Sequence, residues 1–141
     1  MASVLAIDQG TKKTGFAVAD PLRIAVQPIE QVALAGESDE LLDFIAGLLD
    51  ERDVDTFRIG LPFNMDGTEG GRAADVRRFG SRLNERFPKV EVLYWDERLT
   101  TKEAEDLLRS AGYSGRQAKD VKDSWSALVL LRDWIESGEP R

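Results

Sequence analysis

The segment VLAIDQGTKKTGFAVAD, Val4 to Asp20, predicts how the fold begins. Its first four residues are apolar and run directly into the carboxylate of Asp8, a pattern that favours a strand buried on both faces. Gly10 and the polar residues after it predict a turn, and residues 15–19 then predict a second strand, paired with the first in a hairpin. An acid at the end of a buried strand needs a partner, as in an Asx turn that closes the hairpin, or a chemical task.

The rest of the chain alternates helices with strands. Ser38 is a good N-cap, and Thr100 with Glu103 fits a capping box. The segment GLPFNMDGTEGG, residues 60–71, is too rich in glycine and polar residues for regular structure. This order is typical of an α/β fold with a mixed sheet, in one domain of residues 1–141. We expect further strands over 22–32, 56–61 and 90–95, and helices after Ser38, over 72–86, from Thr100 to Gly112 and over 119–136.

Composition excludes several classes of site. The chain has no histidine and no cysteine, so it cannot build a Ser-His-Asp triad, a cysteine nucleophile or the usual zinc sites. A net charge of −7 argues against a broad, non-specific grip on nucleic acid, so local basic groups or a metal would have to make such contacts. The apolar runs are too short to cross a bilayer and no secretory signal is recognisable, so we expect a cytoplasmic protein without a membrane partner.

Acids adjoin apolar runs in three separate segments. Asp8 ends the first strand, Asp96 and Glu97 follow the last predicted strand, and Asp120 and Asp123 fall on the apolar face of the last predicted helix. Singly, they have ordinary explanations as turn, loop and helix-dipole residues. Because the carboxyl ends of parallel strands lie at one edge of a sheet, together they predict a carboxylate cluster there. Clustered carboxylates repel one another unless a cation lies among them, and ligation by oxygen alone favours Mg²⁺ or Mn²⁺.

Three stretches together resemble the YqgF/RuvX family: AIDQGTKKTGFAVAD, GLPFNMDGTEGGRA, and DERLTTKEAE followed by KDSWSALVLL. The likeness spans nearly the whole chain. These small RNase H-like proteins are described both as Holliday junction resolvases and as nucleases that process the 5′ end of pre-16S rRNA. The resemblance implies an RNase H-like fold, a five-stranded mixed sheet flanked by helices, and metal-dependent hydrolysis of phosphodiester bonds at a carboxylate cluster.

Carried over by motif, the resemblance implies that Asp8, Glu97 and Asp123 are the catalytic and metal-binding acids. Asp120 is a further candidate metal ligand, because related resolvases can place an acid three residues before the one that opens the last helix. The choice between Asp96 and Glu97 stays open, and we prefer Glu97 for its longer side chain.

Candidate contacts to nucleic acid lie in the same motifs. Gln9 stands where the family frequently has an aromatic residue, and we expect this change to affect contact between strand and substrate rather than the acid. Arg78, Arg82 and Arg86 recur along the second predicted helix, and we interpret them as an exposed helix face. The expected phosphate contacts, for which ordinary solvated charge is the alternative, are Lys12, Lys13, Asn64, Arg72 and Arg98.

The function predicted first is a metal-dependent nuclease that acts on pre-rRNA, at the 5′ end of pre-16S rRNA. Resolution of branched DNA is the close alternative, since it uses the same chemistry, and it would require a homodimer where an RNA nuclease can be a monomer. A non-catalytic RNA-binding or assembly factor is the second alternative. The motif DQGT followed by Gly15 also resembles the phosphate-binding hairpin of actin-like ATPases and sugar kinases, but those enzymes need two such domains.

Overall fold

A computed structural model describes residues 2–10, 12–23, 26–33, 38–96, 106, 110, 126–135 and 137–139 of the protein. Residues 126–135 form a helix without a numbered label, which we call the C-terminal helix. The helix expected from Thr100 to Gly112 falls almost wholly outside the described residues. The labelled elements are β1 (Ser3–Gln9), β2 (Thr14–Ala19), β3 (Val26–Val32), α1 (Asp39–Glu51), β4 (Val54–Leu61), α2 (Gly71–Arg86) and β5 (Glu91–Asp96).

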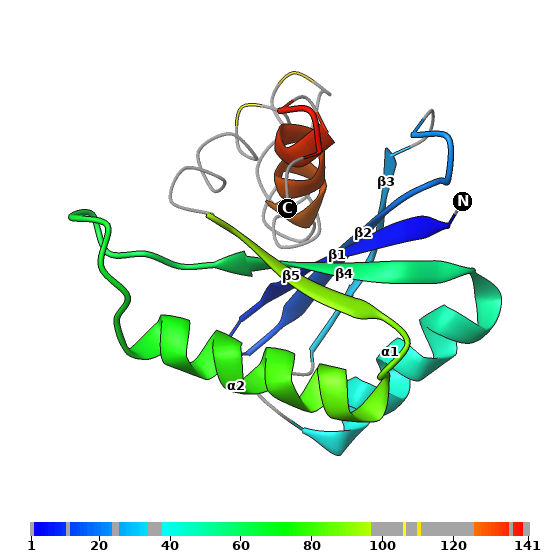
Figure 1. The fold of residues 1–141 in the computed structure, drawn as a ribbon, viewed down its shortest axis with the longest axis horizontal. Helices are drawn as coiled ribbons and strands as arrows, with labels where there is room; N and C mark the ends of the chain where they lie inside the picture. The colour runs from blue at the N-terminus through cyan, green and yellow to red at the C-terminus, as the bar shows by residue number, and fades with distance from the viewer. Residues whose placement is uncertain are drawn as a thin grey trace.

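The strands form one mixed sheet in the order β3-β2-β1-β4-β5. The pairs β1/β2 and β2/β3 are antiparallel, whereas β1/β4 and β4/β5 are parallel. The predicted five-stranded mixed sheet and its opening hairpin are therefore confirmed. Because β1, β4 and β5 run in the same direction, their carboxyl ends meet at one edge of the sheet, which we call the carboxyl edge. The loop between β4 and α2 projects beyond the sheet there (Figure 1).

The third strand is shorter than the sequence pattern predicted. It was expected from residue 22, but β3 begins at Val26. Residues 20–23 form a turn in which the Arg23 N–H donates to the Asp20 carbonyl, with a backbone φ of 59° at Arg23. That φ lies in the left-handed region and is incompatible with a strand. Pro28 pairs with Ala17 on the outermost strand, where the missing N–H of proline costs no interior ladder bond.

Alternate residues of β1 pack on opposite faces of the sheet. Leu5 and Ile7 are fully buried with the apolar faces of α1 and α2, whereas Val4 and Ala6 are buried with the C-terminal helix. Helices therefore cover both faces (Figure 1). As predicted, Ser38 caps α1, since its hydroxyl accepts from the Leu41 N–H at 3.2 Å. No helix within the described ranges is long and apolar enough to cross a membrane.

The arginine row of α2 is ion-paired. Arg82 and Arg86 reach across to α1, with nitrogen to oxygen distances of 2.7 Å to Asp39 and 2.6 Å to Asp43. Arg78 pairs with Asp75 on its own helix. Exposed pairs of this kind each contribute only about 0–1 kcal/mol, but they neutralise the outer surface of the two-helix layer. This agrees with the interpretation of the row as an exposed helix face.

Candidate active site

Asp8 lies near the carboxyl end of β1, the central strand of the sheet. It is half-buried and pairs in register with Gly15, which places no side chain beside the carboxylate. By the alternation of a strand, Asp8 belongs to the same face as Val4 and Ala6. The acid therefore lies on the face that the C-terminal helix covers.

A buried arginine holds that face together. Arg58 of β4 pairs in register with Ala6, and only 1% of its surface is exposed. Its Nη1 donates to the Tyr94 carbonyl at 3.1 Å, and its guanidinium lies 4.8 Å from the ring centre of Trp134 and 5.6 Å from that of Trp95. Such cation–π contacts tie the C-terminal helix to β4 and β5.

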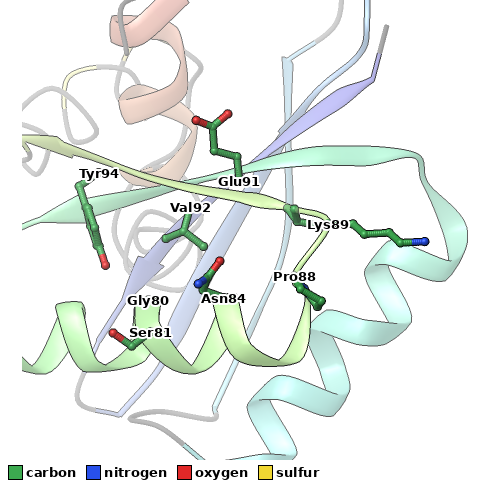
Figure 2. Close-up of a pocket in the computed structure, with 9 residues that line it drawn as sticks. Gly80, Ser81, Asn84, Pro88, Lys89, Glu91, Val92 and Tyr94 are labelled. Carbon is green, nitrogen blue, oxygen red and sulfur yellow. The ribbon is translucent and has the colours of Figure 1, made fainter.

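Asp96 and Glu97 are the two candidates for the second acid. Asp96 lies on the opposite face of the sheet from Asp8, as the alternation of β5 shows. Figure 2 shows Val92 and Tyr94 directed from β5 toward α2. Asp96 follows by the same alternation, and its register partner Leu61 is buried in the core that α1 and α2 share. Asp96 therefore belongs to the face opposite Asp8.

The other predicted acids are not placed. In the part of the chain that the structure describes, no group of three or more acids could hold a metal ion. Among the described residues, Asp8 is therefore the only predicted acid on the face that the C-terminal helix covers, and the carboxylate cluster stays a prediction. The predicted residues outside the described ranges are Glu97, Arg98, Asp120 and Asp123.

The hairpin turn presents two lysines next to the end of β1. The Gly10 N–H donates to the Lys13 carbonyl at 2.9 Å. A Cβ on Gly10 would lie only 2.4 Å from that oxygen, so the turn requires glycine. The side chains of Lys12 and Lys13 are exposed. They are therefore accessible to a phosphate that approaches the carboxyl edge.

Asn64 is engaged inside the loop between β4 and α2. Its N–H donates to the Thr68 carbonyl at 2.7 Å, and its side-chain amide donates to the Thr68 hydroxyl at 3.0 Å. Asp66 in turn accepts from the Thr68 hydroxyl and N–H, which lowers the pKa of Asp66. Asn64 thus orders the loop, a role that the sequence analysis did not assign to it.

The base of this loop is fastened to α2 by an ion pair. Arg77 donates to both oxygens of Glu69, at 2.6 and 3.0 Å. These hydrogen bonds lower the pKa of the Glu69 carboxyl. Arg77 also lies over the ring of Tyr94, 4.9 Å from its centre. The loop therefore keeps a fixed attachment to the helix that follows it.

Arg72 connects α2 to the end of β1. Its Nη2 donates to the Gln9 carbonyl at 2.7 Å and lies 3.4 Å from the Gln9 side-chain oxygen. Gln9 is only 4% exposed and follows Leu5 and Ile7 on the α1/α2 face. The Gln9 side chain is therefore buried on the face opposite Asp8, and the expected effect of Gln9 on substrate contact stays a prediction.

A groove of about 530 Å³ lies elsewhere, between α2 and β5. Ser81 and Asn84 line it from α2, and Tyr94 closes one end with its hydroxyl against Gly80 (Figure 2). The groove extends to Lys89 and Glu91, where β5 starts beside the start of β4. This is the end of the sheet opposite the carboxyl edge, so the groove and Asp8 are separate features.

Sequence reasoning missed Arg58 and the bond from Arg72 to Gln9. An arginine within the apolar run of β4 was a signal for Arg58, since a buried cation needs aromatic or carbonyl partners. Because side chains alternate along a strand, the buried position of Ile7 would have placed Gln9 on the same face of the sheet as Ile7. No local pattern indicates which carbonyl Arg72 contacts, because the two residues lie 63 positions apart.

Comparison with known proteins gives two kinds of likeness. The family model described as "RuvX: Holliday junction resolvase" matches residues 2–137. A protein of Geobacillus sp. strain WCH70 is 40% identical over 135 residues, covering 95% of this chain and 97% of its own. A protein of Bacillus thuringiensis strain Al Hakam is 37% identical over 135 residues, covering 95% and 98%. Both are named as candidate pre-16S rRNA nucleases.

Two solved structures share the fold at low sequence identity. Thermus thermophilus RuvC in complex with a Holliday junction is 14% identical with a TM-score of 0.59, covering 99% of this chain and 98% of that one. Fowlpox virus resolvase in complex with Holliday junction DNA is 12% identical with a TM-score of 0.62, covering 98% and 99%. The predicted RNase H-like fold is confirmed by these neighbours.

Proposed function

The chain belongs to the RuvX family, and from this premise we propose that it is a metal-dependent nuclease that processes the 5′ end of pre-16S rRNA. The names of its relatives support this choice of substrate. The observation that carries the chemistry is the position of Asp8, half-buried near the carboxyl end of the central strand on the face covered by the C-terminal helix. We expect it to work in the cytoplasm as a single domain of residues 1–141.

The proposed acids are Asp8, Glu97 and Asp123, with Asp120 as a further ligand. The position of Asp96 on the opposite face supports Glu97 as the second acid. The donor chemistry fits Mg²⁺ or Mn²⁺, because every candidate ligand is a carboxylate and the chain has no histidine or cysteine. The register partner of Asp8 on β2 is Gly15, which has no side chain. Such an ion, when bound, lowers the pKa of water and offsets the charge that develops on the phosphate.

The protein's own residues orient and bind the substrate. Asp8 is presented by a strand whose end is fixed by the hairpin on one side and by Arg72 on the other. Lys12 and Lys13, exposed on the hairpin turn, are the phosphate contacts that the described geometry favours. In the proposed reaction water attacks phosphorus directly, without a covalent enzyme intermediate, as one ester bond to phosphorus breaks.

Replacing Asp8 tests this function. We expect Asp8→Asn to reduce cleavage of a labelled pre-16S rRNA fragment by at least about 100-fold, because the amide no longer provides a charged oxygen ligand for the divalent ion. Asp50→Asn is the matched control, because it makes the same change on an exposed position of α1. Unchanged cleavage by Asp8→Asn would exclude Asp8 from the reaction.

Resolution of branched DNA is the second candidate, supported by the description of the matching family. A synthetic four-way junction assayed beside the RNA, at equal enzyme, salt and Mn²⁺, distinguishes the two substrates. Faster cleavage of the junction, together with a dimer in solution, would favour the resolvase. RNA binding without cleavage of either substrate in Mg²⁺ or Mn²⁺ would instead indicate a non-catalytic factor.

A further inference from the structure

We propose that Arg72 is a positioning residue for Asp8, and that it acts through the backbone of Gln9 rather than by binding phosphate. The inference rests on the proposed function, since it concerns the same acid. It changes the role expected for Arg72, because the bond that carries the inference ends on the backbone carbonyl of Gln9.

The contacts of Arg72 point inward. The shortest, at 2.7 Å, runs from Nη2 to the carbonyl of Gln9, the residue directly after Asp8. The same nitrogen lies 3.4 Å from the Gln9 side-chain oxygen, and Nη1 lies 3.4 Å from Asp75 on the next turn of α2. Three oxygens on two elements thus share one guanidinium, whose planar donors suit several fixed acceptors.

The location of this bond gives it a role in the site. β1 ends at Gln9, where the chain leaves the sheet for the Gly10 turn. A bond from α2 to that last carbonyl restrains the strand end from the side opposite the carboxylate. Groups that act on a substrate must be held within a fraction of an ångström, and supporting bonds to rigid elements provide this. Arg72 would therefore fix Asp8 without contacting the reacting atoms.

The Gln9 side chain adds a second, weaker contact. Its buried amide oxygen is a further acceptor beside the carbonyl. The carbonyl bond remains available in any variant of Gln9, because it uses the backbone. Gln9→Leu should consequently change the exchange of residues 8–13 and the kcat less than Arg72→Ala does.

The first test measures the strand end directly, without activity. Hydrogen exchange followed by mass spectrometry should show amides of residues 8–13 exchanging at least about tenfold faster in Arg72→Ala. Arg77→Ala is the matched control, since Arg77 is a partly exposed, ion-paired arginine on the same helix. Its exchange should rise in residues 62–70, where Glu69 loses its partner, and not in residues 8–13.

The second test separates positioning from phosphate binding. In Arg72→Ala we expect kcat for RNA cleavage to fall about tenfold to 100-fold, as for a slightly misplaced group, with KM changed less than about threefold. Arg72→Lys and added guanidinium should each restore part of the kcat. A higher KM with unchanged kcat, together with a lower salt dependence of binding, would instead identify a phosphate contact and overturn the proposal.

Two further outcomes would also overturn the positioning role of Arg72. A lower melting temperature with unchanged exchange at residues 8–13 and unchanged kcat would assign Arg72 a general structural role and overturn the proposal. A wild type that cuts neither RNA nor junction would overturn the proposed function and, with it, positioning for catalysis. The exchange data would then still report whether Arg72 holds the end of β1.

Discussion

The two faces of β1 carry side chains of different size and polarity. On the α1/α2 face, Leu5 and Ile7 are fully buried among apolar side chains. On the face of the C-terminal helix, Ala6 and Asp8 stand opposite the small residues Ala17 and Gly15 of β2. The α1/α2 face therefore carries large apolar side chains that stabilise the core. The other face carries small side chains, which leave space for the C-terminal helix and the carboxylate of Asp8. The difference shows how one strand can serve the core and the candidate site at once.

Removing bulk from the first face should produce the largest loss of stability. Phe79 of α2 is fully buried in the α1/α2 core, so Phe79→Ala should lower the free energy of unfolding by about 3–5 kcal/mol. Urea denaturation measures the loss, and cleavage per folded molecule should stay near that of the wild type. A loss below about 1 kcal/mol would contradict the assignment of the bulk of the core to this face.

The face of the C-terminal helix should depend on Arg58. We expect Arg58→Met to keep the volume but lose two cation–π contacts and the bond to the Tyr94 carbonyl, reducing the free energy of unfolding by about 1–3 kcal/mol. The control Arg82→Met removes the surface pair with Asp39 and should cost less than about 1 kcal/mol. Equal losses of unfolding free energy in the two variants would contradict a larger contribution from the buried contacts of Arg58 than from a surface ion pair.

The hairpin lysines should affect substrate binding and leave both faces intact. Replacing Lys12 and Lys13 together by alanine should lower the salt slope of RNA binding by about 1.4, at about 0.7 per lost contact to single-stranded RNA. Thermal unfolding should not change, because both side chains are exposed. Lys89→Ala, at the other end of the sheet, is the control. An unaltered slope in the double variant would assign the lysines to ordinary solvated charge.

The smallest expected effect is a loosening of the loop after β4 in acid. Arg77 lowers the pKa of Glu69 in the folded protein, so the carboxylate fully stabilises the loop at pH values above the ordinary pKa of a free glutamate. This contribution disappears as the pH falls through the lower, folded value. Amide signals of residues 62–70 followed by NMR from pH 6 to 2 should report the transition, and Glu69→Gln should remove the part that depends on the ion pair with Arg77. A transition unchanged in Glu69→Gln would assign the loosening to Asp66, whose pKa is also lowered.

Much of the architecture could be predicted because it follows local patterns. The apolar runs predicted all five strands, and Ser38 marked the start of α1. The early start expected for the third strand was wrong because a positive φ at Arg23 interrupts an otherwise extended pattern. The membership of the family predicted from the motifs is also confirmed.

The candidate site was less predictable, because its supporting contacts join distant positions. Asp8 could be singled out from its place after an apolar run, but the carbonyl that Arg72 binds depends on the packing of α2. No local pattern showed that the Asn64 side chain would donate to Thr68, and the role of the exposed Asn64 as a phosphate contact stays a prediction. The roles of Glu97, Arg98, Asp120 and Asp123 stay predictions, since these residues lie outside the described ranges.

The ion pairs between α1 and α2 also bear on how a polyanion would approach. Because Arg82 and Arg86 are matched by Asp39 and Asp43, that side offers little net attraction to RNA despite its arginines. With a net charge of −7 on the chain, much of the surface repels a phosphate backbone at long range. On the proposed function, the exposed Lys12 and Lys13 would then provide local electrostatic attraction near the end of β1. The charge pattern would orient an incoming strand before any contact forms, and this guidance should weaken as salt is added.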